Sequence, residues 1–236
     1  MASPALDGQS GGSPYQFKAG PYSSHSLLLE QLGAPGQGRR VLDVGGGEGY
    51  LSRILHDRGY RVVCLAAPGS VSASIPQGVE VIEADLDRDT PKLTQDFSFI
   101  VCGDVLEHLR DPGPTLRWLR AQLTPGGRLI ASLPNSGHWY VRWMVLRGRF
   151  PADDRGLFDR THLHFFTWEG WRDLFRGAGL EIEDVAPSAV PFGLAWNLEP
   201  DRIAVRTLER LSYVLGRCWK TMFAYQFVVV SRPRGD

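Results

Sequence analysis

A run of glycines after an apolar segment is the most informative chemical feature of the sequence. The segment VLDVGGGEGYLSRIL places Gly45, Gly46, Gly47 and Gly49 between a predicted strand and a predicted amphipathic helix. Residues without a Cβ let a ligand approach the backbone closely, and a helix N-terminus directs N–H groups and a positive dipole at a carboxylate or phosphate. With Asp43 just before the turn, this pattern predicts a site for a nucleotide-like ligand.

Histidines follow segments that we expect to be parallel strands, at the edge of the sheet where ligands bind. His108 follows one predicted strand in GDVLEHL, His138 follows the next in PNSGHW, and His162 lies in DRTHLHFFT. An imidazole at this edge could accept the proton of a hydroxyl nucleophile. In DRTHLHFFT, an extended chain would point His162 and His164 the same way. For His162 and His138 as the base, a structural role through hydrogen bonds is the alternative.

Carboxylates near these histidines indicate a second candidate chemistry. Asp104, Glu107 and His108 have i, i+3, i+4 spacing, which in a helical turn gathers two carboxylates and an imidazole. His162 could complete this group. Mixed oxygen and nitrogen ligands suit a cation such as Mg²⁺ or Mn²⁺, which would polarise a hydroxyl group. Local packing and hydrogen bonding is the alternative role for the same residues.

The elements that must position these residues alternate between apolar strands and amphipathic helices, which is typical of an α/β fold. The predicted strands are Arg39–Val44, Arg61–Ala66, Val79–Glu83, Phe97–Cys102, Gly127–Leu133, Leu180–Val185 and Phe223–Val230. Helical spacing predicts one apolar stripe through Leu116, Leu119 and Leu123 and another through Trp168, Trp171, Leu174, Phe175 and Ala178. A helix over Asp201–Gly216 has a third stripe, formed by Ala204, Leu208, Leu211 and Leu215.

Composition limits the class of protein and its partners. The 236 residues are 43% hydrophobic and 22% charged, as in a globular chain with a sizeable core. Lys and Arg number 26, as do Asp and Glu, so no basic excess favours a nucleic-acid partner. Three cysteines without CxxC spacing and the absence of a long apolar run predict a cytoplasmic protein without a transmembrane segment. We expect a disordered tail at 1–14 and a single domain over 15–236, with insertions at 134–166 and 187–222.

Three motifs in order, VLDVGGGEGY, FIVCGDVLEHLRDP and LTPGGRLIASLPN, resemble the class I S-adenosylmethionine-dependent methyltransferases over roughly residues 22–186. The segments ASLPNSGHWYVRWMVLRGRF, DRTHLHFFT and FAYQFVVV more closely resemble bacterial methyltransferases found with glycosyltransferases in cell-surface polysaccharide or natural-product settings. The resemblance implies a Rossmann-like methyltransferase fold. It consists of a seven-stranded, mostly parallel sheet with its last strand antiparallel, helices on both faces and an inserted cap.

The resemblance also implies S-adenosyl-L-methionine as cofactor and assigns residues to it. Asp43 would orient the amino group of the cofactor, and the glycine turn would hold its methionyl part. Asp85 and Leu86 would lie near the adenine, and we place Cys102 in the same binding site. The possible metal ligands Asp104, Glu107, His108 and His162 resemble the Glu-x-x-Glu-His and distant His of small-RNA 2′-O-methyltransferases, with Asp104 in place of the first Glu.

One departure from the family concerns the ribose of the cofactor. Ala66 stands where the family usually has an acid that accepts hydrogen bonds from both ribose hydroxyls. A charged hydrogen bond is worth about 1.5–3 kcal/mol, so its absence could weaken binding roughly 10- to 100-fold. Hydroxyl groups from Ser70, Ser72 or Ser74 in the next loop could replace it, with a solvated Ser-rich turn as the alternative.

Two aromatic segments could cover the site. HWYVRWMVLRGRF interleaves Trp139, Tyr140, Trp143 and Met144 with Arg142, Arg147 and Arg149. Such a helix could lie over the substrate or against a lipid surface, and an ordinary capping helix is the alternative. The second segment could close over the cofactor or only attach the N-terminus to the core, and it contains Tyr15, Phe17, Tyr22 and His25.

The function that these features favour is S-adenosylmethionine-dependent O-methylation of a small molecule, a sugar or a lipid-linked acceptor. His162 or His138 would accept the hydroxyl proton. The alternative is a methyltransferase-like binding or assembly protein that does not methylate, because Ala66 replaces the ribose-binding acid. Metal-dependent RNA methylation is disfavoured by the zero net charge.

Overall fold

A computed structural model of the protein describes residues 20–33, 35–93, 96–196, 198–199 and 202–235. The predicted tail at 1–14 and the aromatic residues Tyr15 and Phe17 lie outside this part of the chain. Within the described ranges, none of the helices is both long and apolar enough to cross a membrane.

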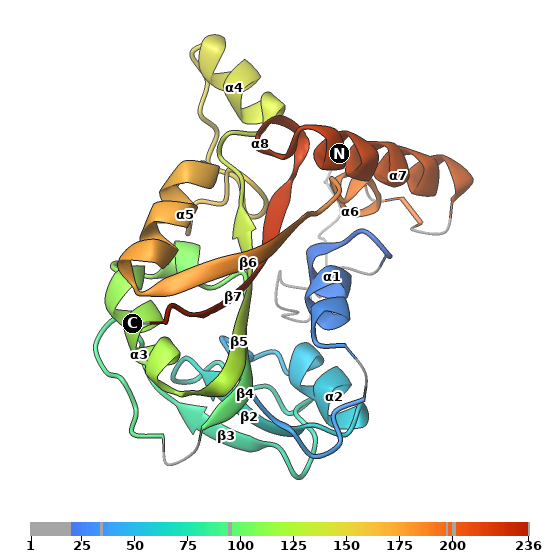
Figure 1. The fold of residues 1–236 in the computed structure, drawn as a ribbon. Helices are drawn as coiled ribbons and strands as arrows, with labels where there is room; N and C mark the ends of the chain where they lie inside the picture. The colour runs from blue at the N-terminus through green and yellow to red at the C-terminus, as the bar shows by residue number, and fades with distance from the viewer. Residues whose placement is uncertain (1–19, 34, 94–95, 197, 200–201, 236) are drawn as a thin grey trace, which may run out of the picture.

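A seven-stranded sheet in the order β3-β2-β1-β4-β5-β7-β6 forms the centre of the molecule (Figure 1). Its strands are β1 (Arg40–Val44), β2 (Arg61–Ala66), β3 (Glu80–Glu83), β4 (Phe97–Gly103), β5 (Leu123–Pro134), β6 (Leu180–Pro187) and β7 (Gln226–Pro233). The first five are parallel, and β7 runs antiparallel between β5 and β6. This confirms the expected mostly parallel sheet with an antiparallel last strand.

Helices cover both faces of the sheet (Figure 1). The helices are α1 (Ser24–Gln31), α2 (Tyr50–Asp57), α3 (Pro112–Ala121), α4 (Trp139–Leu146), α5 (Trp168–Gly177), α6 (Phe192–Trp196), α7 (Ile203–Cys218) and α8 (Lys220–Phe223), with a 3-10 turn at Leu106–His108. On one face, Leu28 of α1 and Leu55 of α2 pack on Val41 of β1. On the other, Leu116 of α3 and Trp171 of α5 share a core with the neighbouring Leu42. Successive residues of the strand therefore point into the cores on opposite faces of the sheet, as expected for a pleated strand.

Strand order reverses direction between β1 and β4, which are neighbours in space although β2 and β3 separate them in sequence. In open α/β sheets a crevice forms at such a switch point, outside the carboxyl ends of the strands. The turn after β1 contains the glycines, and the turn after β4 contains Asp104, Glu107 and His108. The topology therefore brings the two motifs with the clearest chemistry to the same edge.

Several expected elements differ from the observed ones. Strand β5 begins at Leu123 rather than Gly127, so Leu123 does not belong to the apolar stripe of α3, which ends at Ala121. The last strand begins at Gln226 rather than Phe223, because the short helix α8 occupies Lys220–Phe223. The predicted apolar stripe on α7 is not a core face: Ala204 and Leu211 are exposed, whereas Val205 is buried. Three residues of that stripe instead line a cavity, namely Leu208, Leu211 and Leu215. Helical periodicity located the apolar side of this helix, but it could not tell a core from a cavity wall.

Candidate active site

The glycine turn is shaped by close contacts with the protein itself. Gly45 and Gly49 both have φ of +77°, a left-handed conformation that favours glycine. A Cβ on Gly46 would lie 2.7 Å from Cγ of Asp43 and 3.0 Å from Sγ of Cys64. A Cβ on Gly47 would lie 2.8 Å from the carbonyl oxygen of Ser70. Larger residues would therefore displace both the acid at the end of β1 and the loop after β2.

Asp43 lies at the end of β1 and is completely buried, yet it forms part of a cavity wall. Its Oδ2 accepts a 2.6 Å hydrogen bond from the Ser52 hydroxyl. Its Oδ1 has no hydrogen-bond partner among the described residues. Burial raises the pKa of this carboxyl to about 6, an effect that hydrogen bonds from Ser52 partly offset. A buried carboxylate oxygen of this kind needs a donor, and the ammonium group of an amino-acid ligand would supply one.

The loop after β2 folds back over the glycine turn. The Ser72 N–H donates to the Gly47 carbonyl at 2.8 Å, and the Ser74 hydroxyl donates to the Glu48 carbonyl at 2.6 Å. Ser72 and Ser74 therefore bind the backbone of the glycine turn. Ser70 lines the cavity together with Ala66, the residue in place of the usual acid, and its hydroxyl donates to the Ala67 carbonyl. Of the three serines considered for the ribose, Ser70 is the one on the cavity wall.

The remaining predicted cofactor residues divide between the cavity wall and the core. Asp85 and Leu86 line the cavity, and the Asp85 carboxylate pairs with Arg88 at 3.3 Å. Cys102 is completely buried within the core cluster behind the wall, and the residues after it, Gly103 and Asp104, line the cavity instead. Burial raises the pKa of the Cys102 thiol, with the Asp43 carboxylate adding to the effect. The thiol therefore stays neutral, and the side chain packs within the core.

The cavity has a volume of about 1390 Å³, more than one small ligand needs. The glycine turn, Asp85 and Leu86 form part of its wall. The wall also includes many apolar side chains, among them Tyr140, Phe158, Phe192, Leu208, Leu211 and Phe223. Glu107, His108, His138 and His162 also line it. The cavity therefore has room for a cofactor and a second, apolar molecule, with titratable groups within the same space.

Asp104 does not join the histidine cluster that its spacing predicted. Its backbone has φ of +55°, and its Oδ1 accepts hydrogen bonds from Ser132 at 2.5 Å and from Gln226 at 2.7 Å. Its Oδ2 lies 3.9 Å from Nε2 of the buried His25 on α1. These contacts direct the Asp104 side chain toward β5, β7 and α1, and it is not part of the group formed by Glu107, His108 and His162. Positive φ at a non-glycine residue is uncommon and concentrates at functional sites.

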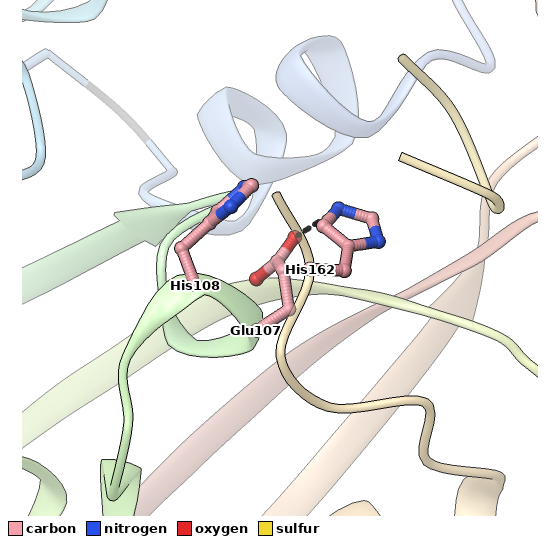
Figure 2. Close-up of side chains that lie close together, drawn as sticks. All are labelled: Glu107, His108 and His162. Carbon is pink, nitrogen blue, oxygen red and sulfur yellow. Dashed lines mark ion pairs between the residues drawn. The ribbon is translucent and has the colours of Figure 1, made fainter. Parts of the chain in front are cut away.

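Glu107, His108 and His162 come together from two segments (Figure 2). Nε2 of His162 lies 3.9 Å from Oε1 of Glu107, and both side chains are largely buried. The rings of His108 and His162 have centroids 4.8 Å apart. One potential ligand atom from each residue falls within 4.8 Å of the others. The arrangement can hold a proton on an imidazole next to a carboxylate, or offer three donors to a cation.

The loop that carries His162 is fixed by its own hydrogen bonds. The Thr161 hydroxyl donates to Asp159 at 2.6 Å and lies 3.1 Å from Nδ1 of His108. Burial tends to raise the pKa of Asp159, but the hydrogen bonds from Thr161 and the nearby His162 and His108 lower it overall. Nε2 of His164 lies 2.9 Å from the Leu109 carbonyl. His164 is therefore structural, whereas His162 lines the cavity.

His138 is uncharged at neutral pH. It is almost fully buried at the N-terminus of α4, where Nδ1 accepts from the Tyr140 N–H at 3.3 Å. Burial lowers its pKa to about 4, so the neutral ring carries its proton on Nε2. A nitrogen that already holds a proton cannot accept one. Among the three predicted catalytic histidines, the geometry favours His162 as the base.

The pKa of His138 predicts how stability depends on pH. Because the pKa is near 4 when folded and near 6.5 in its reference state, the stability that the neutral ring contributes is present above pH 6.5 and is lost as pH falls to 4. In His138→Asn the amide oxygen can still cap α4. Between pH 6.5 and pH 4, the free energy of unfolding of the native protein should decrease by about 3 kcal/mol more than that of the variant. Urea denaturation at the two pH values measures both decreases. Equal losses in the two proteins would contradict the assignment.

Comparison with known proteins identifies the family to which this site belongs. A model of the family described as a methyltransferase domain matches residues 20–185. This chain belongs to the methyltransferase domain family. A ubiquinone biosynthesis O-methyltransferase of Xanthomonas euvesicatoria pv. vesicatoria is 33% identical over 175 residues, which cover 68% of the methyltransferase described here and 68% of the relative. The expected class I S-adenosylmethionine-dependent methyltransferase is thereby confirmed.

Solved structures share the fold of this methyltransferase. An S-adenosylmethionine dependent methyltransferase from Mesorhizobium loti has a TM-score of 0.61 at 20% identity, covering 89% of this chain and 98% of that one. The 1,6-didemethyltoxoflavin-N1-methyltransferase of Burkholderia thailandensis, solved with S-adenosylhomocysteine, has a TM-score of 0.54 at 17% identity, covering 90% of this chain and 77% of that one. These similarities confirm the Rossmann-like methyltransferase fold.

His25, Ser132 and Gln226 are site residues that the sequence motifs did not reveal as a group. They converge on Asp104 from α1, β5 and β7, at separations of up to 122 residues along the chain. His25 also packs on Tyr50, with ring centroids 5.1 Å apart, and lines the cavity. No local spacing encodes such a meeting, because only the sheet order brings these elements together.

Proposed function

We propose that this methyltransferase methylates a hydroxyl group on a small molecule with a large apolar part. The many apolar side chains in the wall of the cavity that His162 and Glu107 also line are the observation that carries this proposal. It supports an aromatic or lipid-linked acceptor over a free sugar, because a sugar would leave its hydroxyl groups next to apolar side chains. The relative in Xanthomonas is named as an O-methyltransferase of ubiquinone biosynthesis, which supports oxygen as the methylated atom.

S-adenosylmethionine supplies an electrophilic methyl group when it is bound. In this proposal Asp43 accepts a hydrogen bond from its amino group through Oδ1, and the backbone of the glycine turn borders its methionyl part. Asp85 and Leu86 contact the adenine. The Ser70 hydroxyl binds the ribose in place of the acid that Ala66 replaces. The three cysteines of the chain are free thiols, which supports a cytoplasmic site of action.

His162 removes the proton of the acceptor hydroxyl in the proposed mechanism. Its imidazole gains a positive charge when it takes this proton, and the buried Glu107 carboxylate 3.9 Å away stabilises that charge. The Thr161–Asp159 hydrogen bonds hold the loop so that the ring stays at the cavity wall. The rest of the site aligns the hydroxyl oxygen with the methyl group, which is the larger part of catalysis in such a displacement.

A divalent cation at Glu107, His108 and His162 is the second candidate, because the three donors already lie close together. Two imidazoles and one carboxylate suit Mn²⁺ better than Mg²⁺, which prefers oxygen ligands. The cation would polarise the hydroxyl group in place of a protein base. Treatment with EDTA separates the two: we expect the metal-free protein to keep its rate. A loss that added Mn²⁺ restores would establish the cation instead.

An acceptor panel tests the proposed reaction. Purified protein would be incubated with S-adenosylmethionine and either alkyl-substituted catechols or methyl glycosides, and S-adenosylhomocysteine would be quantified by mass spectrometry. We expect turnover with the catechols that rises with alkyl length. Turnover with the glycosides alone would contradict the apolar acceptor. Cofactor binding without turnover of either class of acceptor would instead support a binding or assembly protein.

A further inference from the structure

Helix α4 carries apolar side chains that face solvent at one end of the molecule. Trp143 is 51% exposed and Leu146 is 82% exposed, and Trp139 and Phe150 are also exposed. The helix projects away from the sheet, beyond its carboxyl edge (Figure 1). Of α4, only Val141 is buried. Large apolar groups grouped in this way mark an interaction surface rather than ordinary surface scatter.

Helices α7 and α8 add a second exposed apolar group at the same end. The Asn135 side chain, just before α4, donates to the Thr221 carbonyl of α8 at 3.3 Å and to the carbonyl of Ala224, the residue after α8, at 2.8 Å. Ile203, Leu211 and Trp219 are exposed on or beside α7, and Trp196 is exposed on α6. Trp139, Trp196 and Leu211 line the cavity while remaining exposed. The cavity therefore reaches the solvent at exposed apolar side chains of these helices.

Basic side chains concentrate on the same elements although the whole chain is neutral. Residues 139–150 contain Arg142, Arg147 and Arg149 and no acid. Residues 202–220 contain five basic side chains and one acid, the latter being Glu209. All three arginines around α4 are exposed, and Arg147 lies over the Trp143 ring, 5.5 Å from its centroid. This surface, defined by α4, α7 and α8, is both apolar and cationic.

We propose that the surface defined by α4, α7 and α8 docks on an anionic lipid bilayer and places the mouth of the cavity against it. Trp and Tyr favour the interfacial layer of a membrane, apolar tips such as Leu146 enter the acyl region, and arginines pair with lipid phosphates. Residues 139–150 combine aromatic and aliphatic side chains with charged side chains that are all basic. This composition is complementary to a bilayer with negatively charged headgroups. An apolar acceptor dissolved in that bilayer would enter the cavity without crossing water, a consequence that rests on the proposed function.

Vesicle binding tests the docking independently of catalysis. The full chain would be sedimented with vesicles of phosphatidylcholine alone or of phosphatidylcholine mixed with phosphatidylglycerol. We expect binding to the mixed vesicles that weakens as salt rises, and little binding to phosphatidylcholine alone. Absence of binding to the mixed vesicles would overturn the proposal, even in a protein that methylates a soluble, short-chain acceptor.

Two double variants assign the binding to this surface. Trp143→Ser with Leu146→Ser removes apolar tips that do not line the cavity, and Arg147→Gln with Arg149→Gln removes two charges. Each should lower partitioning into mixed vesicles at least about tenfold while leaving S-adenosylhomocysteine binding unchanged. Val81→Ser, on exposed β3, is the matched control. Unchanged partitioning of both variants would overturn the proposal. So would a native dimer in sedimentation velocity that these variants dissociate, since a second copy would then cover the surface.

Discussion

Replacing His162 with asparagine is expected to lower kcat roughly 10²- to 10⁴-fold, the range for loss of a general base. Asparagine is close to histidine in size and polarity but cannot accept the hydroxyl proton at neutral pH. Because the proposed cofactor contacts are made by Asp43, the glycine turn and Asp85 rather than by His162, the Kd for S-adenosylhomocysteine should stay the same. Steady-state kinetics with the best acceptor of the panel, together with calorimetric titration, would measure both quantities.

His164→Asn is the matched control, because His164 lies only two residues from His162 but does not line the cavity, and its Nε2 contacts the Leu109 carbonyl. We expect this control to keep kcat within a few-fold and to lose some thermal stability. Glu107→Gln should lower kcat by less than His162→Asn, since it removes only the charge that stabilises the imidazolium. A His162→Asn enzyme with full kcat would exclude His162 as the base.

Replacing Asp43 with asparagine should have opposite effects on stability and on cofactor binding. The pKa of Asp43 is raised from 3.8 to about 6 by burial, so the folded state is destabilised as pH rises from 4 to 6, and the cost persists above pH 6. Asparagine carries no charge, and its amide oxygen can still accept from Ser52. Asp43→Asn should therefore increase the free energy of unfolding at pH 7.5 by up to about 3 kcal/mol, measured by urea denaturation.

The same substitution should weaken S-adenosylhomocysteine binding at pH 7.5 by roughly 10- to 100-fold, the value of one charged hydrogen bond. Protonation of Asp43 should also weaken binding to the native protein, by up to about tenfold for each pH unit below 6. The asparagine variant should lack this dependence. Calorimetry at several pH values measures both effects. Equal affinity of the two proteins across the series would show that Asp43 does not hold the amino group.

The sheet and the glycine turn were predictable because their signals are local. Apolar runs placed β2 at Arg61–Ala66 with correct ends, and consecutive glycines located the turn after β1. Buried parallel strands must be continuously apolar, and a turn with positive φ strongly favours glycine. Each of these requirements is satisfied by neighbours in sequence, so a single sequence records it.

The arrangement of Asp104 could not be predicted in the same way. Its spacing to Glu107 and His108 predicted one shared helical face, but helix geometry begins only at Leu106, after a residue with φ of +55°. The Asp104 carboxylate instead accepts a hydrogen bond from Gln226, which is 122 residues away in the sequence. Likewise, only the fold shows that His164 contacts a carbonyl while His162 lines a cavity. Side-chain direction at strand ends depends on turn conformation and on distant partners, which residue spacing does not encode.

The central claim is that this chain binds an adenosyl amino acid at the glycine turn, with Asp43 on its amino group, although Ala66 replaces the ribose acid. Calorimetric titration of the native protein with S-adenosylhomocysteine at pH 7.5 tests it most directly. We expect saturable heat with one ligand per chain and an accompanying rise in Tm. No heat and no change in Tm at millimolar ligand would contradict it.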